Sequence, residues 1–280
     1  MWQPDCQGNL RLTAKLNLRS RTLAGLNDAT FMLIKFLQRT LARDRHNSCN
    51  RCYQWGGELV ANLKPKALLD VGCGDGGQLF KYLKHQPEHF CGIEGAPSLR
   101  PKAEARGIKV VGADLNGVWP YADNTFDVVH SAQVIEHIHN TRLFVSEAFR
   151  VLKPGGTAVI ASENLTSFLN LSALALGYTP FSLIRVCGWY LGNPLGLHYG
   201  ETDEEGVPIT DPAFAGVSGH IRVLSVLQAK ELFERIGFKV EVGSIGLMPI
   251  PDCIGRHLER LMPRRGHFLT VEGRKPAAST

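Results

Sequence analysis

The sequence predicts an α/β protein with a Rossmann-like, doubly wound parallel sheet. After residue 60, short apolar runs alternate with helical stretches, a glycine-rich loop follows the first run, and an acidic residue closes each of the next two. Because parallel neighbouring strands need crossover connections, this alternation indicates a sheet with helices on both faces.

The individual elements follow from local patterns. Strands are predicted at 67–71, 90–94, 109–113, 126–130, 157–162, 238–242 and 268–271, and helices at 78–84, 97–106 and 141–152. Ser225 and Gln228 form the pattern of a capping box, which predicts that a helix begins there and runs to Ile236 before Gly237 ends it.

Residues 1–59 are expected to form an N-terminal helical extension, with an amphipathic helix over 28–43 that begins at Asp28. Residues 1–52 carry nine Lys or Arg against three Asp, whereas the rest of the chain is almost neutral. The basic side chains of this helix form either a solvated face or a contact with an anionic substrate or membrane surface. The first 25 residues also have the Arg-rich, acid-poor composition of transit peptides.

Residues 60–280 are expected to form the main domain, with an insertion at 164–219. The inserted stretch is rich in glycine, proline and aromatic residues and is too long for a simple connection. We expect it to form a lid over an acceptor pocket, lined by apolar side chains from Leu165, Phe168, Leu169, Phe181, Trp189 and Tyr190.

The composition, with 44% hydrophobic and 20% charged residues, is typical of a globular protein without a transmembrane segment. Seven scattered cysteines favour free thiols in a reducing compartment, and hence a cytoplasmic protein. The pair Cys49 and Cys52 lacks zinc-site partners, so a structural role is favoured. No nucleic-acid partner is expected, because no basic, aromatic RNA-binding module is visible. The oligomeric state stays open.

The glycine loop runs from Leu68 to Gly77 and joins a strand to a helix. Glycines at 72, 74 and 77 also satisfy the G-x-G-x-x-G spacing of nicotinamide dehydrogenases, with Glu94 about twenty residues further on. Asp70 argues against a dinucleotide, because a negative charge there repels a diphosphate but favours the ammonium or sulfonium group of S-adenosylmethionine. Asp114, at the end of the third predicted strand, is placed to accept a hydrogen bond from an adenine amino group.

The segment Asp70-x-Gly72-x-Gly74-x-Gly76 resembles motif I of class I S-adenosylmethionine-dependent methyltransferases. Glu94 resembles the acid that binds both ribose hydroxyls, and Asp114-Leu115 the adenine-binding pair. Residues 125–137 and 147–156 are similar to the family's fourth strand with its following loop, and to the helix and turn before its fifth strand. Together these motifs cover roughly residues 60–163.

The resemblance implies seven strands in the order 3-2-1-4-5-7-6, the last antiparallel, and S-adenosylmethionine as cofactor. Its donor-binding residues would be Asp70, Gly72, Cys73, Gly74, Gly76, Glu94, Asp114, Leu115 and Gln133. Each acid also has a structural alternative: Asp70 as a helix cap, Asp114 as the start of a turn, and Glu94 as a solvated strand end.

The candidate catalytic bases are His220, at the end of the insertion, and His137, after the fourth strand. His220 either accepts a proton from the acceptor or only fastens the insertion. Some relatives hold a divalent metal with an E-x-x-E-H segment. Here the segment is Gln133-x-x-Glu136-His137, and because the first carboxylate is missing no metal is expected.

The function expected from these residues is methyl transfer to a small, apolar or amphipathic metabolite, most simply at oxygen. The alternatives are a methyltransferase for a lipid-linked or anionic acceptor at a membrane surface, and a regulatory subunit that binds the donor without turnover.

Overall fold

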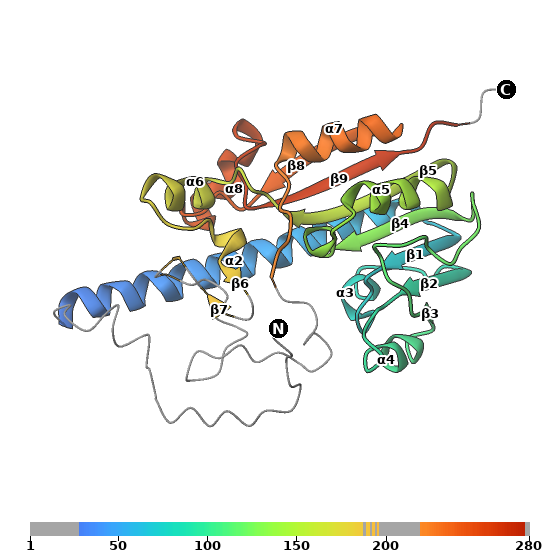
Figure 1. Cartoon of the computed structure of the whole chain (residues 1–280), viewed down its shortest axis with the longest axis horizontal. Helices are drawn as coiled ribbons and strands as arrows, with labels where there is room; N and C mark the ends of the chain where they lie inside the picture. Colours follow the sequence, from blue (N-terminus) through green and yellow to red (C-terminus); the bar gives the residue numbers. More distant parts are fainter. Residues whose placement is uncertain (1–27, 187–188, 191, 194, 196–218, 278–280) are drawn as a thin grey trace, which may run out of the picture.

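A computed structural model describes residues 28–186, 189–190, 192–193, 195 and 219–277 of the chain. Its centre is a seven-stranded sheet (Figure 1) in the order β3-β2-β1-β4-β5-β9-β8. The strands are β1 (Ala67–Val71), β2 (His89–Ile93), β3 (Lys109–Val111), β4 (Phe126–Ala132), β5 (Leu152–Glu163), β8 (Lys239–Ile245) and β9 (Phe268–Arg274). Strands β1 to β5 are parallel, and β9 runs antiparallel between β5 and β8. The predicted strand order is confirmed.

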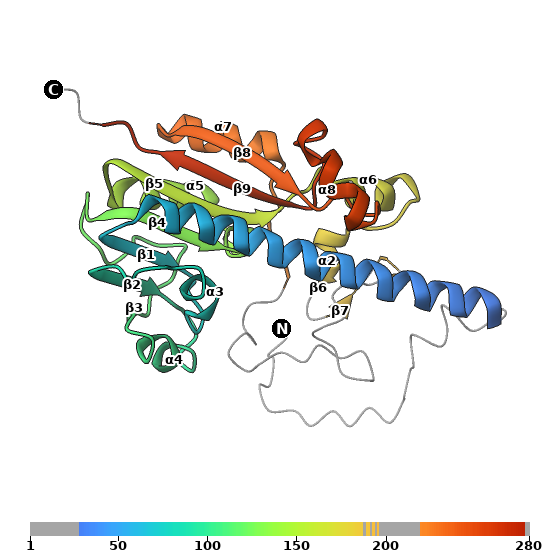
Figure 2. The ribbon, with the colours of Figure 1, turned by 180° about the vertical axis from the view of Figure 1, so that it is seen from behind.

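One face of the sheet is covered by α2 (Asp28–Leu63), a helix of 36 residues (Figure 2). The predicted helix over 28–43 is therefore too short, because packing on the sheet continues the helix beyond the local amphipathic pattern. Its C-terminal part includes Gly57, where a Cβ would overlap Tyr82, so glycine permits close packing there. At Gly56 a Cβ would make ordinary contacts of 3.8 Å with His130 and Val159 of the sheet. The expected boundary between residues 59 and 60 falls within this helix.

The opposite face is covered by α5 (Thr141–Val151) and α7 (Val226–Ile236). Both helices present buried apolar side chains to the sheet, among them Phe144 and Phe233, which are fully buried. The predicted capping box is confirmed, since Ser225 Oγ accepts from the Gln228 amide and Gln228 Oε1 accepts from the Ser225 amide. Gly237 ends the helix with a φ of 119°.

The connections beyond β1 and β2 contain only single turns of helix. They are α3 (Gly77–Phe80) and α4 (Arg100–Glu104), shorter than the helices predicted at 78–84 and 97–106. Pro101 sits at the start of α4, where proline is tolerated, and glycines precede both α3 and the next strand. Short helices suffice here because the C-terminal half of α2 covers the same face of the sheet.

The insertion after β5 begins with α6 (Phe168–Ala175), a single turn at Phe181–Leu183, and the two-stranded pair β6 (Arg185–Val186) and β7 (Trp189–Tyr190). Leu169 and Phe181, expected to line an acceptor pocket, are instead 1% and 4% exposed and pack with Cys52 of α2 in the core. The side chains of Trp189 and Tyr190, and residues 196–218 of the predicted lid, lie outside the described residues.

A further helix, α8 (Asp252–Leu258), was not predicted and is followed by a single turn at Glu259–Leu261. It connects β8 to β9 and is tied to α2, because Arg51 donates to Asp252 and to both carboxylate oxygens of Glu259. Since Glu259 lies more than 200 residues along the chain from Arg51, this ion pair has no local sequence signal.

Cys49 and Cys52 are free thiols on α2. Burial raises the pKa of Cys49 to about 11 and that of Cys52 to about 12, so both stay protonated and inert near neutral pH. This agrees with the structural role predicted for the pair. Among the helices of the described residues, none is both long and apolar enough to cross a membrane.

The burial of side chains on α7 predicts how substitutions there change stability. Replacing Phe233 by Ala on α7 should lower the free energy of unfolding by about 3–5 kcal/mol, because the side chain is fully buried. Leu227→Ala on the same helix is the matched control: its side chain is 45% exposed, so the cost should stay within about 0.5 kcal/mol. Urea unfolding of both variants measures the difference, and equal losses would contradict the assignment of the buried face.

Candidate active site

The carboxyl ends of β1, β2, β4 and β5 meet at one edge of the sheet, where ligands of such folds bind. The glycine loop leaves β1 there. Gly72 packs against the loop after β4, since a Cβ at Gly72 would lie 2.4 Å from a Val134 methyl group. Gly74 has a φ of +58°, and a Cβ there would meet no atom within 4 Å, so its backbone borders open space. Gly76 also has a left-handed backbone conformation, with a φ of 77°.

Glu94 is buried at the end of β2 and supports this loop. Its Oε2 accepts a hydrogen bond of 2.8 Å from the Gly74 amide, and its Oε1 one of 2.7 Å from the Ala96 amide. The alternative of a solvated strand end is therefore wrong. Each carboxylate oxygen has a second lone pair, so these bonds leave the predicted contact with ribose hydroxyls intact.

Asp70 is buried in β1, and its neighbour in the register is His130 of β4. His130 Nδ1 donates to Asp70 Oδ1 over 2.7 Å, so the carboxylate is not a helix cap. Asp70 lies two residues before Gly72, at the carboxyl end of β1 from which the glycine loop leaves.

Asp114 and Leu115 follow β3 at the same edge. Asp114 is exposed, and its Oδ1 accepts from both the backbone and the side-chain nitrogen of Asn116, which lowers the pKa of the carboxyl. This is the turn geometry given above as the structural alternative. Oδ2 takes no part in these two bonds and is the atom that could accept from an adenine amino group. Leu115 packs partly buried against the core.

Cys73 and Gln133 complete the predicted donor-binding set. Cys73 is buried beneath the loop, where burial raises its thiol pKa well above the ordinary range, so only its backbone can reach a ligand. Gln133 follows β4 with a φ of +57°, a conformation unusual outside glycine. Its Nε2 is buried and has no hydrogen-bond acceptor among the described residues.

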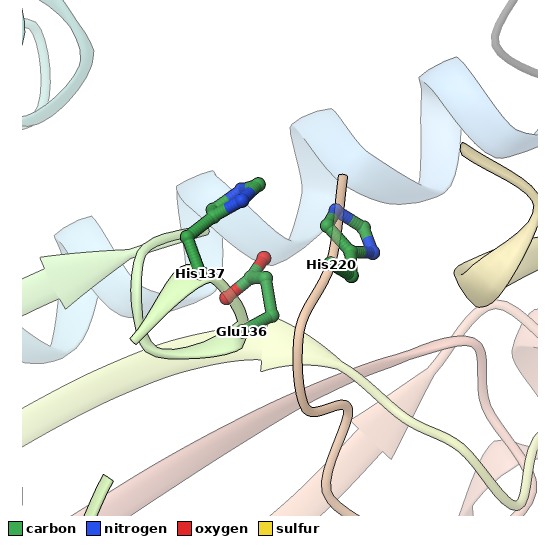
Figure 3. A group of neighbouring side chains, drawn as sticks. All are labelled: Glu136, His137 and His220. Atoms are coloured by element: carbon green, nitrogen blue, oxygen red, sulfur yellow. The ribbon is translucent and has the colours of Figure 1, made fainter. Parts of the chain in front are cut away.

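A second group of side chains lies beyond β4 and consists of Glu136, His137 and His220, here named the Glu136 cluster (Figure 3). Their ligating atoms lie within 4.8 Å of one another. His137 Nδ1 donates to the Gly219 carbonyl over 2.9 Å and His220 Nδ1 to the Ser182 carbonyl over 2.8 Å. The predicted bases therefore lie side by side, with ring centroids 4.9 Å apart, and both also fasten the insertion.

The Glu136 carboxyl is fully buried. Ser162 donates to Oε2 over 2.8 Å, and Oε1 has no hydrogen-bond partner among the described residues. Burial raises the pKa of this carboxyl to about 7, against the lowering effect of His220. The backbone carbonyl of Glu136 accepts from the amides of Ile221 and Arg222, so the returning insertion is bound directly to this loop.

Glu163 ends β5 beside the Glu136 cluster, and the sequence analysis missed it. Arg45 of α2 donates to its Oε1 over 2.5 Å. His220 Nδ1 and His267 Nε2 lie 3.6 and 3.8 Å from its Oε2. The signal that marks Glu94, an acid at the carboxyl end of a buried apolar strand, also marks Glu163. The contacts with Arg45 and His267 span more than 100 residues and have no comparable signal.

Comparison with known proteins concerns the stretch that contains the glycine loop. The family model described as a methyltransferase domain matches residues 69–160. Residues 69–160 are therefore similar to a methyltransferase domain. The cofactor of this family is S-adenosylmethionine, and the open backbone at Gly74 with the carboxylates of Asp70 and Glu94 around it fits such a ligand.

Relatives of the methyltransferase domain act on different acceptors. Norajmaline N-methyltransferase of Rauvolfia serpentina is 37% identical over 108 residues, which are 35% of this chain and 36% of the relative. The 2-methyl-6-phytyl-1,4-hydroquinone methyltransferase of Synechocystis is 32% identical over 120 residues, 40% of this chain and 36% of that protein. This chain thus spans about a third of the length of either relative.

One solved structure extends the likeness in fold beyond the methyltransferase domain. It is the putative methyltransferase in complex with the Trm112 methyltransferase activator of Haloferax volcanii, at 19% identity and a TM-score of 0.51, covering 86% of this chain and 96% of that one. At this identity the likeness concerns the fold alone.

Glu94 and Asp114 give a paired prediction. Glu94→Ala and Asp114→Ala should each weaken S-adenosylhomocysteine binding by ~1–3 kcal/mol, because each loses hydrogen bonds to a polar ligand. Glu94→Ala should also lower the free energy of unfolding by about 1.5–3 kcal/mol, since two backbone amides lose their acceptor. Calorimetric titration and urea unfolding measure the two effects. Normal donor binding by both variants would show that the ribose and adenine positions are misassigned.

His267 gives a prediction on pH. Burial lowers its pKa from 6.5 to about 4, although Glu163 raises it. Below about pH 6.5 this histidine binds a proton in the unfolded chain but stays neutral in the folded chain. Its contribution to the free energy of unfolding is therefore complete above pH 6.5 and is lost as the pH falls towards 4. Each pKa unit corresponds to about 1.4 kcal/mol.

The measurement is the free energy of unfolding of wild type and His267→Gln at about pH 7.5 and about pH 5. Wild type should lose more stability than the variant between the two. The raised pKa of Glu136 works in the opposite direction, since protonation favours its buried form, but it acts in both proteins and cancels in the comparison. An equal loss would mean that His267 is not held neutral.

Proposed function

We propose that this chain is an S-adenosylmethionine-dependent methyltransferase acting on the oxygen of a small, apolar or amphipathic metabolite. The observation that carries the proposal is the short connection between the two halves of the site. Residues 133–137 contain both Val134, which packs on Gly72 of the donor loop, and two members of the Glu136 cluster. The acceptor would lie between them.

Oxygen is favoured because of the chemistry of the Glu136 cluster. S-adenosylmethionine supplies an activated methyl group, and the enzyme aligns the acceptor with it. A neutral amine attacks without a protein base, whereas a hydroxyl must lose its proton. The imidazole nitrogens of His137 and His220 and the carboxylate of Glu136 are groups that can accept such a proton.

An apolar acceptor is supported by the surface of the insertion. A groove of about 480 Å³ runs along α6 and is lined by Phe168, Leu171, Ser172, Ala175, Pro249 and Ile250. Of the residues expected to contact the acceptor, Phe168 is in this groove. None of the lining residues belongs to the glycine loop or to the Glu136 cluster, so the groove would hold an extended part of the acceptor and not its reacting atom.

A lipid-linked or anionic acceptor at a membrane surface is the second candidate, because the start of α2 exposes large apolar side chains. Met32 is 66%, Leu33 56% and Phe36 65% exposed, and Arg39 and Arg43 lie on the same helix. Exposed apolar residues beside basic ones are typical of helices that lie in a membrane interface. Flotation of the chain with anionic vesicles, compared with a Phe36→Glu variant, separates the two candidates.

Donor binding tests the first half of the proposal. S-adenosylhomocysteine should raise the melting temperature and NAD should not, because Asp70 disfavours a diphosphate. Gly74→Leu should abolish the shift by filling the open space over the loop. Gly155→Leu is the matched control, since Gly155 also has a left-handed φ, of 84°, and no atom within 4 Å of its Cβ position. An equal shift with NAD would refute the proposal.

Turnover tests the second half. Labelled donor is offered to a panel of phenols, hydroxylated lipids and amines, and the product is analysed for the methylated atom. Transfer to hydroxyls, with a loss of at least ~100-fold in His220→Ala at unchanged donor affinity, is the expected result. Donor binding without transfer to any acceptor would favour the regulatory subunit.

A further inference from the structure

The Glu136 cluster has the composition and protonation of a metal site. It contains two imidazoles and one carboxylate, a set that binds divalent transition ions such as Zn²⁺ and leaves coordination positions open. Two ligands come from one turn at Ile135–His137, and the third comes from the far end of the insertion (Figure 3). The site thus exists only when the insertion has returned to the sheet.

The hydrogen bonds of the two histidines set their tautomers. Because Nδ1 of His137 and Nδ1 of His220 each donate to a backbone carbonyl, Nε2 is the unprotonated nitrogen of each neutral ring. A histidine that binds a metal through one nitrogen almost always donates its other N–H to a carbonyl or carboxylate. Both rings are therefore held in the form that a metal requires.

Glu136 provides an independent observation. Its side chain is fully buried, Oε2 accepts from Ser162, and Oε1 has no hydrogen-bond partner among the described residues. A buried carboxylate oxygen without a partner is costly, and in native proteins it marks a missing ion or water. The carboxylate that carries this oxygen belongs to the Glu136 cluster.

We propose that Glu136, His137 and His220 bind one divalent transition-metal ion at the carboxyl edge of β4. Gln133 stands where the E-x-x-E-H segment has its first carboxylate, and for that reason no metal was expected. The imidazole of His220 supplies the third ligand in its place. Ligands of a tetrahedral Zn²⁺ with bonds of about 2.1 Å lie about 3.4 Å apart. The ligating atoms lie within 4.8 Å of one another, so binding would draw them together by at most about 1.4 Å. The set with two imidazoles selects Zn²⁺ or Co²⁺ over Mg²⁺.

The role of the ion rests on the proposed function: with an ion bound, the three side chains act as ligands and not as bases. The open positions of the ion would bind the acceptor's oxygen and favour release of its proton to water, as metal ions do with bound water. Metal binding itself does not depend on that role. It can be measured without donor or acceptor, so failure of the methyl-transfer proposal and failure of the metal proposal are distinguishable.

The test is calorimetric titration of the chelator-treated full chain with ZnCl₂ and with MgCl₂. One Zn²⁺ per chain is expected, and affinity should fall at least ~100-fold in Glu136→Gln and in His220→Ala. His257→Ala, an exposed histidine on α8, is the control and should bind normally. Unchanged Zn²⁺ binding in both cluster variants, or no binding by wild type, would overturn the proposal.

A spectroscopic measurement keeps the test valid if a variant folds poorly. Co²⁺ bound to the wild-type chain by nitrogen and oxygen ligands should give weak visible bands without intense near-ultraviolet thiolate absorption. A strong thiolate band would place the ion at cysteines such as Cys49 and Cys52 and would overturn the proposal.

Discussion

The buried charge of Glu163 constrains the whole carboxyl edge of the sheet. A carboxylate without exposure to solvent needs a donor or a cation beside it, and Arg45 of α2 supplies one, more than 100 residues away along the chain. Two other distant segments pack around the same carboxylate, since His220 Nδ1 and His267 Nε2 lie 3.6 and 3.8 Å from its Oε2. Glu163 therefore links the helix, the sheet and the Glu136 cluster.

The strand order and most strand positions could be predicted from the sequence, because a parallel sheet gives short apolar runs with acids or glycines at their carboxyl ends. Strand β1 has the predicted bounds, and the others differ at their ends by a few residues. The largest difference is at β5, which was predicted to begin at residue 157 and begins at Leu152. Pro154 and Gly155, which are typical of turns, lie inside this strand. Helices were harder to predict where glycine serves packing, as Gly57 does in α2.

Some residues of the site could also be predicted from local patterns, and others could not. Glu94 and Asp114 are recognisable because each acid ends a predicted strand, and the structure places both at the expected edge. The partner of Asp70 is not recognisable, since His130 becomes its neighbour only through the pairing of β1 with β4. The contact between His137 and His220 is not recognisable either. It forms because the chain comes back to His137 at Gly219, 82 residues further on, and no local pattern predicts this. Residues 1–59 were predicted to be an extension because no local pattern shows that Arg45 reaches Glu163.

The contact between Arg45 and Glu163 also bears on how the chain can be divided. The stretch that matches the family starts at residue 69, and the main domain inferred from the sequence starts at residue 60; neither includes Arg45. A fragment that begins at either point would keep a buried carboxylate and lose the guanidinium bonded to it, a change that typically costs about 3–5 kcal/mol. The minimal unit that folds should therefore include α2 from before Arg45, so this helix belongs to the same folding unit as the sheet.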